Sequence, residues 1–161
     1  MTKIDVETCL NEAYGSIGSR NLRQVVARMS RGPDTQIVRS LMRRFFVKEG
    51  TDENYDRCFR FEILDDDEKF VLSISVVAPV YLLLKINAGK ITFPKPSGDF
   101  SDSCSYLVSI MNEARIQEVE HAILMRKVDV PTYSADESIM YNALFSDVPC
   151  SGGVFELLEH L

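Results

Sequence analysis

The chain has 161 residues and a net charge of −6, with 45% hydrophobic and 26% charged residues. A chain of this length can bury most of its apolar surface, and this composition is typical of a folded protein rather than a disordered one. We therefore expect a single domain over residues 1–161. The longest apolar run, residues 76–84, is far shorter than the ~20 residues of a membrane span and contains Pro79, so no membrane partner is expected.

The cysteines lie more than forty residues apart and form no C-x-x-C pair, which is not the spacing of a zinc site. They are Cys9, Cys58, Cys104 and Cys150. Residues 1–16 lack the basic start, apolar run and small-residue cleavage site of an export signal. We expect a protein of the reducing cytoplasm that needs no metal or cofactor.

Charge is distributed unevenly along the chain. Residues 1–50 contain nine Lys and Arg against five Asp and Glu, a balance of +4, whereas residues 51–161 contain nine against nineteen, a balance of −10. A basic segment beside an acidic body either binds anionic ligands or docks on that body, and the sequence leaves both readings open.

Helical periodicity predicts three helices in the first fifty residues, over 4–14, 21–31 and 34–50. The second ends at Gly32 and Pro33, and the third begins at Asp34, a favourable N-cap residue. The third helix carries a wide apolar stripe and is expected to be well buried. Its apolar members are Ile37, Val38, Leu41, Met42, Phe45 and Phe46.

From residue 58 the period changes to two, which predicts strands at 58–64 and 70–76 joined by an acidic turn. This hairpin is expected to have one solvated face. Residues 80–86 predict a third strand, either buried on both sides or at an edge because Pro79 cannot donate to a ladder. A short fourth strand is expected at 91–93.

A long helix is predicted over residues 103–127, with Glu113, Glu118 and Glu120 on the side opposite its apolar stripe. A short strand at 128–130, a helix capped by residues 134–137 that runs through Phe145, and a last helix from 154 complete the pattern. The predicted fold is α+β: N-terminal helices, an antiparallel β-meander of three to four strands, and C-terminal helices packed on the sheet.

No catalytic cluster is visible. The histidines, His121 and His160, lie in no metal-ligand spacing. Cys58 or Cys104 paired with His121 would form a nucleophilic thiolate, but free cysteines are more often small buried hydrophobes. Residues 15–19 lack the lysine of a phosphate-binding loop. We therefore expect no enzyme and no catalytic residue.

The acidic turn consists of Asp65, Asp66, Asp67 and Glu68. It lacks the alternating ligands and glycine of a calcium loop, so a solvated turn is favoured over a metal site. A third reading is that these acids, together with Glu113, Glu118 and Glu120 of the long helix, bind a basic partner protein, since complementary charge speeds encounter and selects partners.

Seven arginines give the N-terminal third the density of a nucleic-acid surface. They are Arg20, Arg23, Arg28, Arg31, Arg39, Arg43 and Arg44. They spread around two helices without interleaved exposed aromatic residues, and the pI of the whole chain is near 5.0. A solvated face, partly docked on the acidic body, is therefore favoured over a nucleic-acid partner.

The strand, acidic turn and strand of residues 59–86, with Ser-Val-Val-Ala-Pro-Val-Tyr at 75–81, resemble the sheet of bacterial immunity proteins that neutralise polymorphic or contact-dependent toxins. The segment 141–147 has a similar character. The resemblance implies a stoichiometric inhibitor that covers the active site of a toxin, commonly a basic nuclease. It implies no catalytic residue.

Three functions remain open from the sequence. The first is an immunity protein whose acidic turn and helix face bind a cationic toxin domain. The second is a type III secretion chaperone, which is also small, acidic and α/β, binds an effector and self-associates. The third is a nucleic-acid-binding or small enzymatic domain that uses the arginine-rich helices.

Overall fold

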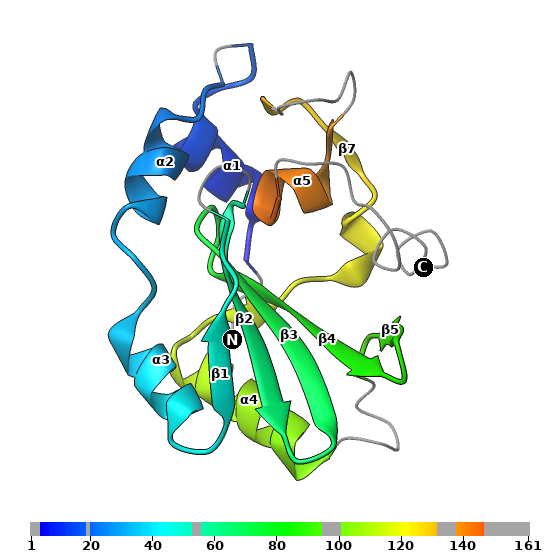
Figure 1. Ribbon diagram of the computed structural model, residues 1–161. Helices are drawn as coiled ribbons and strands as arrows, with labels where there is room; N and C mark the ends of the chain where they lie inside the picture. The colour runs from blue at the N-terminus through cyan, green and yellow to red at the C-terminus, as the bar shows by residue number, and fades with distance from the viewer. Residues whose placement is uncertain (1–3, 19, 53–55, 95–100, 132–137, 147–161) are drawn as a thin grey trace.

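The computed structural model describes residues 4–18, 20–52, 56–94, 101–131 and 138–146. In these residues the fold is α+β, with a mostly antiparallel sheet and helices at one end and on one face of it (Figure 1). The described helices are α1 Val6–Tyr14, α2 Arg23–Met29, α3 Thr35–Met42, α4 Asp102–Glu113 and α5 Met140–Leu144. A 3₁₀ turn spans His121–Ile123.

Five strands form an antiparallel meander in the order β1-β2-β3-β4-β5, and β6 pairs with β4 in parallel. Their bounds are β1 Phe46–Glu49, β2 Cys58–Asp65, β3 Glu68–Ser75, β4 Val80–Asn87, β5 Lys90–Thr92 and β6 Gln117–Glu118. A second, two-stranded sheet joins β7 Lys127–Val128 to β8 Ser138–Ile139. The four predicted strands of the meander correspond to β2–β5; β1 adds a strand at one edge, and β6 pairs with β4 beside β5.

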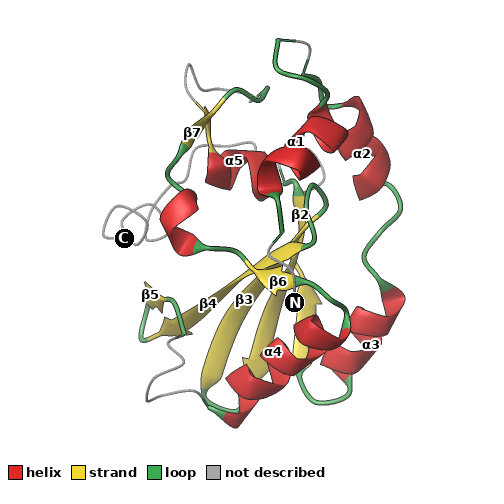
Figure 2. Cartoon of the chain, turned by 180° about the vertical axis from the view of Figure 1, so that it is seen from behind, coloured by secondary structure: helices red, strands yellow, loops and turns green. Residues whose placement is uncertain are grey.

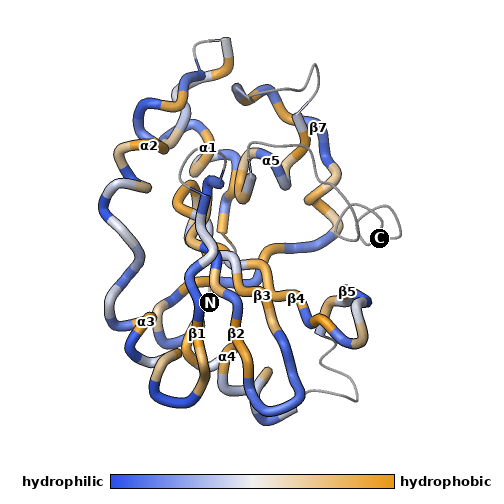
Figure 3. The backbone as a smooth tube through the Cα atoms, in the orientation of Figure 1, coloured by the Kyte–Doolittle hydropathy of each residue, from blue (hydrophilic) through white to orange (hydrophobic). Residues whose placement is uncertain are grey.

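The β2–β3 hairpin follows the alternation of its sequence. Phe61 lies opposite Leu72 and Ile63 opposite Phe70, and all four side chains are buried. The turn closes through Asp66, whose φ of 47° lies in the left-handed region that aspartate tolerates better than most residues. Along the tube in Figure 3, this tip is hydrophilic, while the neighbouring strands are largely apolar.

Apolar side chains form two clusters that meet at β4. Val80, Leu82 and Leu84 belong to the first cluster, with residues of α1, α2 and α5, whereas Tyr81 and Leu83 belong to the second, with residues of α3 and α4. We call them the α1-side and α4-side clusters. Figure 2 shows α3 and α4 on one face of the sheet, and α1, α2 and α5 beyond its end. Alternate residues of β4 are buried on opposite faces. Since β4 also pairs with β3 on one side and with β5 and β6 on the other, it is an interior strand, and the edge position considered from Pro79 is wrong.

The predicted solvated face of the hairpin is only partly correct. Ser73 and Ser75 on β3 are buried, and so are Leu82, the register partner of Ser73, and Leu84, that of Val71. This face is solvated mainly at the end of the sheet near the hairpin tip, where Leu64 is exposed. The alternation of serine with apolar residues therefore predicts the strand correctly. It does not predict that the face carrying Ser73 and Ser75 is also buried.

The prediction of one helix over 34–50 is wrong at its C-terminal end. α3 ends at Met42, and residues 46–49 form β1, paired with β2. Phe45 and Phe46 both fit the helical stripe, but only Phe45 is buried, and Phe46 lies opposite Leu64 instead. Strand pairing along β2 thus overrides the local helical pattern.

The long helix predicted over 103–127 is also wrong. α4 ends at Glu113, and Arg115 has a φ of 59°. The amide of Ile116 donates to the carbonyl of Met111 at 2.9 Å, which is the bond that closes a helix end when the following residue is left-handed. The chain then enters β6, where Gln117 N donates to Pro79 O at 3.0 Å.

The predictions for the end of the chain are tested only in part. A short strand is present at Lys127–Val128, close to the predicted 128–130. The helix predicted to follow residues 134–137 is wrong at its start, because Ser138–Ile139 form β8, paired with β7, and α5 begins at Met140. The proposed cap at residues 134–137 and the last helix from 154 lie outside the described residues.

Candidate functional site

The four acids of the hairpin tip differ in their surroundings. An Oδ2 of Asp65 accepts a hydrogen bond from the Ser103 hydroxyl and lies 3.8 Å from an Arg44 guanidinium nitrogen. Glu68 pairs with Lys85 at 2.5 Å. Burial alone would raise the pKa of Glu68, but hydrogen bonds from Lys85 and the nearby serines outweigh it and lower this pKa. Asp66 and Asp67 remain as the exposed acids of the tip.

The other three predicted acids do not share a helix face. Glu113 is the last residue of α4, Glu118 lies in β6, and Glu120 precedes the 3₁₀ turn. Asp65 contacts the first turn of α4 through Ser103, and a helix of 12 residues is about 18 Å long. The predicted surface is therefore divided between opposite ends of α4.

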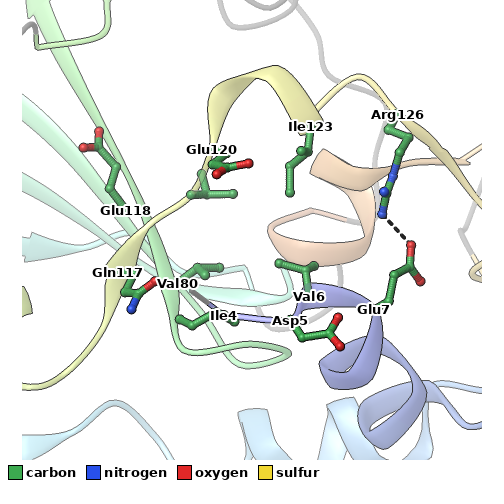
Figure 4. Close-up of a pocket in the computed structure, with 11 residues that line it drawn as sticks. Ile4, Asp5, Val6, Glu7, Val80, Gln117, Glu118, Glu120, Ile123 and Arg126 are labelled. Carbon is green, nitrogen blue, oxygen red and sulfur yellow. Dashed lines mark hydrogen bonds and ion pairs between the residues drawn. The ribbon is translucent and has the colours of Figure 1, made fainter. Parts of the chain in front are cut away.

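Glu118 and Glu120 instead line a groove of about 440 Å³ with two acids from the start of the chain, Asp5 and Glu7. Its other lining side chains are Ile4, Val6, Val80, Gln117, Val119, Ile123 and Arg126. We call this the acidic groove. Figure 4 shows α1 along one wall, with β6 and the 3₁₀ turn opposite, and Val6 and Ile123 facing each other between them.

Local bonds orient the carboxylates of the acidic groove. Asp5 caps α1 and accepts from the Thr8 hydroxyl at 2.8 Å and the Thr8 amide at 3.3 Å, and these bonds lower its pKa. Glu7 pairs with Arg126 across the groove and lies 3.9 Å from Arg20. The lining thus carries four carboxylates against one guanidinium, around an apolar floor. Such a site favours a cation with an aliphatic stem, as in lysine or arginine.

His121 lies beside Glu118, one of the acids that line the groove. Its Nε2 is 3.4 Å from an Oε1 of Glu118 without the geometry of a hydrogen bond, and its ring stacks on Phe93 with centroids 3.7 Å apart. The stacking fixes the ring beside Glu118. In Figure 4, Glu118 extends away from Val6 and Ile123, whereas Glu120 lies above the groove.

The cysteines considered as nucleophiles are buried. Burial raises the pKa of Cys58 to about 12 and that of Cys104 to about 11. Cys58 belongs to the α1-side cluster and Cys104 to the α4-side cluster. Both thiols are protonated at neutral pH, so neither has the lowered pKa of an activated cysteine.

Three of the seven arginines bond to the body of the protein. Arg20 donates to the carbonyl of Asp129 at 2.7 Å, and Arg28 to the carbonyls of Val76 and Val77 at 3.1 Å each. Arg44 approaches Asp65 at the hairpin tip. The remaining four, Arg23, Arg31, Arg39 and Arg43, are exposed.

A second cavity, of about 840 Å³, lies beside the connection between α2 and α3. Glu113 lines it together with Glu12, and Arg28 and Arg31 also contribute. Because both acidic and basic side chains line this cavity, it should select cations less strongly than the acidic groove does.

Sequence reasoning selected Glu118 and Glu120 but missed Asp5 and Glu7. More than one hundred residues separate the two pairs, and only the folded chain brings them to one groove. The sequence signal available for Asp5 was its position three residues before Thr8, which is typical of a helix cap and not of a binding site.

Among the described helices, none combines the length and the apolar character needed to cross a membrane. Nor do the described side chains bring three or more His, Cys, Asp or Glu together at a site for one metal ion. Comparisons of the whole chain with protein-family models, with curated proteins and with solved structures find no match.

Proposed function

We propose that this protein is a cytoplasmic immunity protein that binds a cationic bacterial toxin domain, such as a nuclease, and neutralises it as a stoichiometric inhibitor. The observation that carries the proposal is the acidic groove, in which Asp5, Glu7, Glu118 and Glu120 surround an apolar floor. The resemblance of residues 59–86 to the sheet of immunity proteins supports the same function.

The groove suits a basic side chain that a toxin uses on an anionic substrate. A lysine or arginine of the toxin would lay its aliphatic stem against Val6 and Ile123 and place its charge beside Glu120. A toxin that acts on nucleic acid needs such cations to contact phosphates. An inhibitor that occupies them blocks the substrate without performing chemistry.

The hairpin tip has a different role in this proposal. Asp65 and Glu68 already bond within the protein, and Asp66 and Asp67 are solvated. Exposed charges of this kind accelerate association more than they strengthen the complex. The tip therefore steers the toxin, and the groove holds it.

The test uses a toxin domain encoded by a neighbouring gene and compares two double charge reversals of equal size. The variant Glu118→Lys with Glu120→Lys alters the groove, and Asp66→Lys with Asp67→Lys is its matched control at the tip. Isothermal titration calorimetry should show about 100-fold weaker binding for the groove variant. The tip variant should lose less than about tenfold, mainly in its association rate at low salt.

Two results would contradict the proposal. Unchanged affinity of the groove variant removes the groove as the interface, and a larger loss from the tip variant transfers the interface to the hairpin. A genome that encodes an effector rather than a toxin beside this gene argues for the second candidate.

That second candidate is a type III secretion chaperone. Apolar side chains exposed near the edge of the sheet, Phe46 and Leu64, favour it because such a chaperone offers apolar surface to an effector and to its own second copy. Sedimentation velocity over a wide concentration range distinguishes the two functions. A dimer at all concentrations favours the chaperone, and a concentration-independent monomer counts against it.

A further inference from the structure

The first strand of the sheet, β1, has a free outer edge. β1 pairs with β2 on one side, and no other described strand pairs with it. Figure 1 shows it at the margin of the sheet, beside α3. A strand in this position presents unpaired peptide groups to any extended chain that approaches.

The register identifies the peptide groups that face outward. Gly50 N donates to Arg60 O at 2.9 Å, so these two residues form a hydrogen-bonded pair of the antiparallel ladder. Hydrogen-bonded and non-bonded pairs alternate, which makes Lys48 with Glu62 a bonded pair and Val47 with Ile63 a non-bonded pair. The N–H and C=O groups of Val47 and Glu49 therefore point away from β2.

Apolar side chains accompany this edge. Phe46 is 69% exposed, and its register partner Leu64 on β2 is 41% exposed. Met42, at the end of α3 and four residues before Phe46, is 63% exposed. An exposed aromatic residue beside unpaired backbone groups is the combination used when an extended segment adds a strand to a sheet.

Charge determines which segment fits. Arg43, three residues before Phe46, and Lys48, two residues after it, are both exposed. Glu62, opposite Lys48, is paired with Lys69 at 3.1 Å. Glu49 is the one exposed acid of β1. An incoming strand therefore meets mainly positive charge, which favours acidic side chains on it.

A second copy of the chain fits this edge less well. Antiparallel pairing of β1 with itself, in the register that bonds Val47 of one copy to Glu49 of the other, would place Lys48 opposite the Lys48 of the second copy. Like charges close together across strands are destabilising.

We propose that the outer edge of β1 binds an extended acidic segment of a partner protein by strand addition. The segment bonds to the outward peptide groups of Val47 and Glu49 and covers Phe46 with an apolar side chain. This interface is separate from the acidic groove, and it stands whether or not the groove binds a toxin.

The probe is a fluorescein-labelled peptide in which glutamate alternates with valine and phenylalanine, and its counterpart carries lysine in place of glutamate. The acidic peptide should bind and the lysine peptide should not. On binding, the amides of Val47 and Glu49 should become protected from hydrogen exchange. Those of Phe46 and Lys48, already bonded to β2, should change little.

Two variants and one control locate the interface. Phe46→Ser should weaken binding at least about tenfold, since an apolar contact of this size is worth more than 1.4 kcal/mol. Val47→Pro removes the outward donor while leaving the bonds to β2, and should abolish binding. Val26→Ser removes a similarly exposed apolar side chain, 62% exposed on α2, and should have no effect.

The proposal is overturned if the acidic peptide fails to bind at millimolar concentration or if both peptides bind equally. It is also overturned if Phe46→Ser, checked for folding by circular dichroism, binds as the unmodified protein does. A concentration-dependent dimer that Phe46→Ser dissociates would assign the edge to a second copy instead.

Discussion

The two faces of the sheet are stabilised in different ways. On the α4 side, Leu41 of α3 and Leu107 and Met111 of α4 pack against apolar residues such as Phe61 and Phe70, and every buried member of the cluster is hydrophobic apart from the hydroxyl of Tyr81. On the α1 side, buried hydrogen bonds join segments that are distant in the sequence.

The centre of the α1 side is the fully buried Arg57. Its Nη1 donates to the Tyr14 hydroxyl at 2.8 Å, its Nη2 donates to the carbonyl of Pro131, and its guanidinium lies 5.3 Å from the Tyr14 ring. The Tyr14 hydroxyl in turn donates to the carbonyl of Ala143 at 2.6 Å. One residue thus connects α1, the start of β2, the segment after β7 and α5.

This difference affects how each side tolerates change. An apolar cluster loses stability in proportion to the volume removed, because its contacts are many and weak. A buried polar network fails at single atoms, because each missing donor leaves an acceptor without a partner in a medium of low dielectric constant. The α1 side also supports the wall of the acidic groove through α1, so its integrity decides whether the site exists.

The largest expected effect is that of Arg57→Ala. Tyr14 and Pro131 would lose their donor and a large cavity would form, so the free energy of unfolding should fall by about 3–5 kcal/mol. Urea denaturation measures it, with exposed Arg23→Ala on α2 as a control that should change by less than about 0.5 kcal/mol. Arg57→Met fills most of the volume without the bonds, and full stability of that variant would show that the network is dispensable.

Leu107→Ala on α4 examines the apolar side. Leu107 is completely buried, and its truncation should cost about 3 kcal/mol through lost contacts and a residual cavity. Ser105→Ala on the exposed side of the same helix is the matched control. Since the described side chains packed with Leu107 form an apolar cluster, Leu107→Met should recover most of the loss. If it recovers nothing, shape rather than volume controls this cluster.

Ser75→Ala should have an intermediate effect on the α1 side. The Ser75 hydroxyl donates to the carbonyl of Leu144 at 2.8 Å and accepts from the amide of Val77 at 3.1 Å. Loss of both bonds in a buried site should cost about 1–2 kcal/mol by thermal or urea unfolding. Ser30 makes a similar bond to the carbonyl of Ala27 on the surface, and Ser30→Ala should be nearly neutral. Equal losses from the two variants would contradict the importance of burial.

The apolar side is the part that the sequence predicts well. Alternation along β2 and β3 identifies Phe61, Ile63, Phe70 and Leu72 as one face. The predicted stripe of α3 is correct for Ile37, Leu41 and Phe45, which are buried, and wrong for Met42 and Phe46, which are exposed. The polar side is not predictable in this way, because Arg57 has the sequence signature of any surface arginine. Its burial depends on two hydrogen-bond acceptors, the Tyr14 hydroxyl and the Pro131 carbonyl. They lie 43 and 74 positions away from it in the sequence.

The end of α4 is also not predictable from local sequence, because it depends on contacts with distant segments. Arg115 occupies the left-handed position after α4 where glycine is usual, so no stop signal exists in the sequence. The error in the end of this helix also made the predicted acidic surface wrong. Glu118 and Glu120 were assigned to a helix face, whereas β6 and the following turn place them beside Asp5 and Glu7. Long-range packing, not local propensity, assembles the candidate site.

The smallest expected effect is a difference in cysteine labelling between the two sides of the sheet. It needs no substitution, because Cys58 and Cys104 report on the α1-side and α4-side clusters. The raised pKa values of Cys58, about 12, and Cys104, about 11, mean that the thiolate fraction at mildly alkaline pH is far below that of an ordinary thiol. Iodoacetamide should therefore label half-buried Cys9 before Cys58 and Cys104 in the folded protein. Peptide mass spectrometry assigns each labelled position.

The order in which the thiols of Cys58 and Cys104 are labelled then reports which side of the sheet unfolds locally more easily. Cys104 lies in the first turn of α4, where helices fray, whereas Cys58 begins β2 and its Sγ lies 3.2 Å from the carbonyl of Phe145. Labelling at rising, subdenaturing urea concentrations should modify Cys104 before Cys58. Simultaneous labelling would mean that both clusters open in one cooperative unit, and earlier labelling of Cys58 would mean that the polar network holds the α1 side less firmly than apolar packing holds the α4 side.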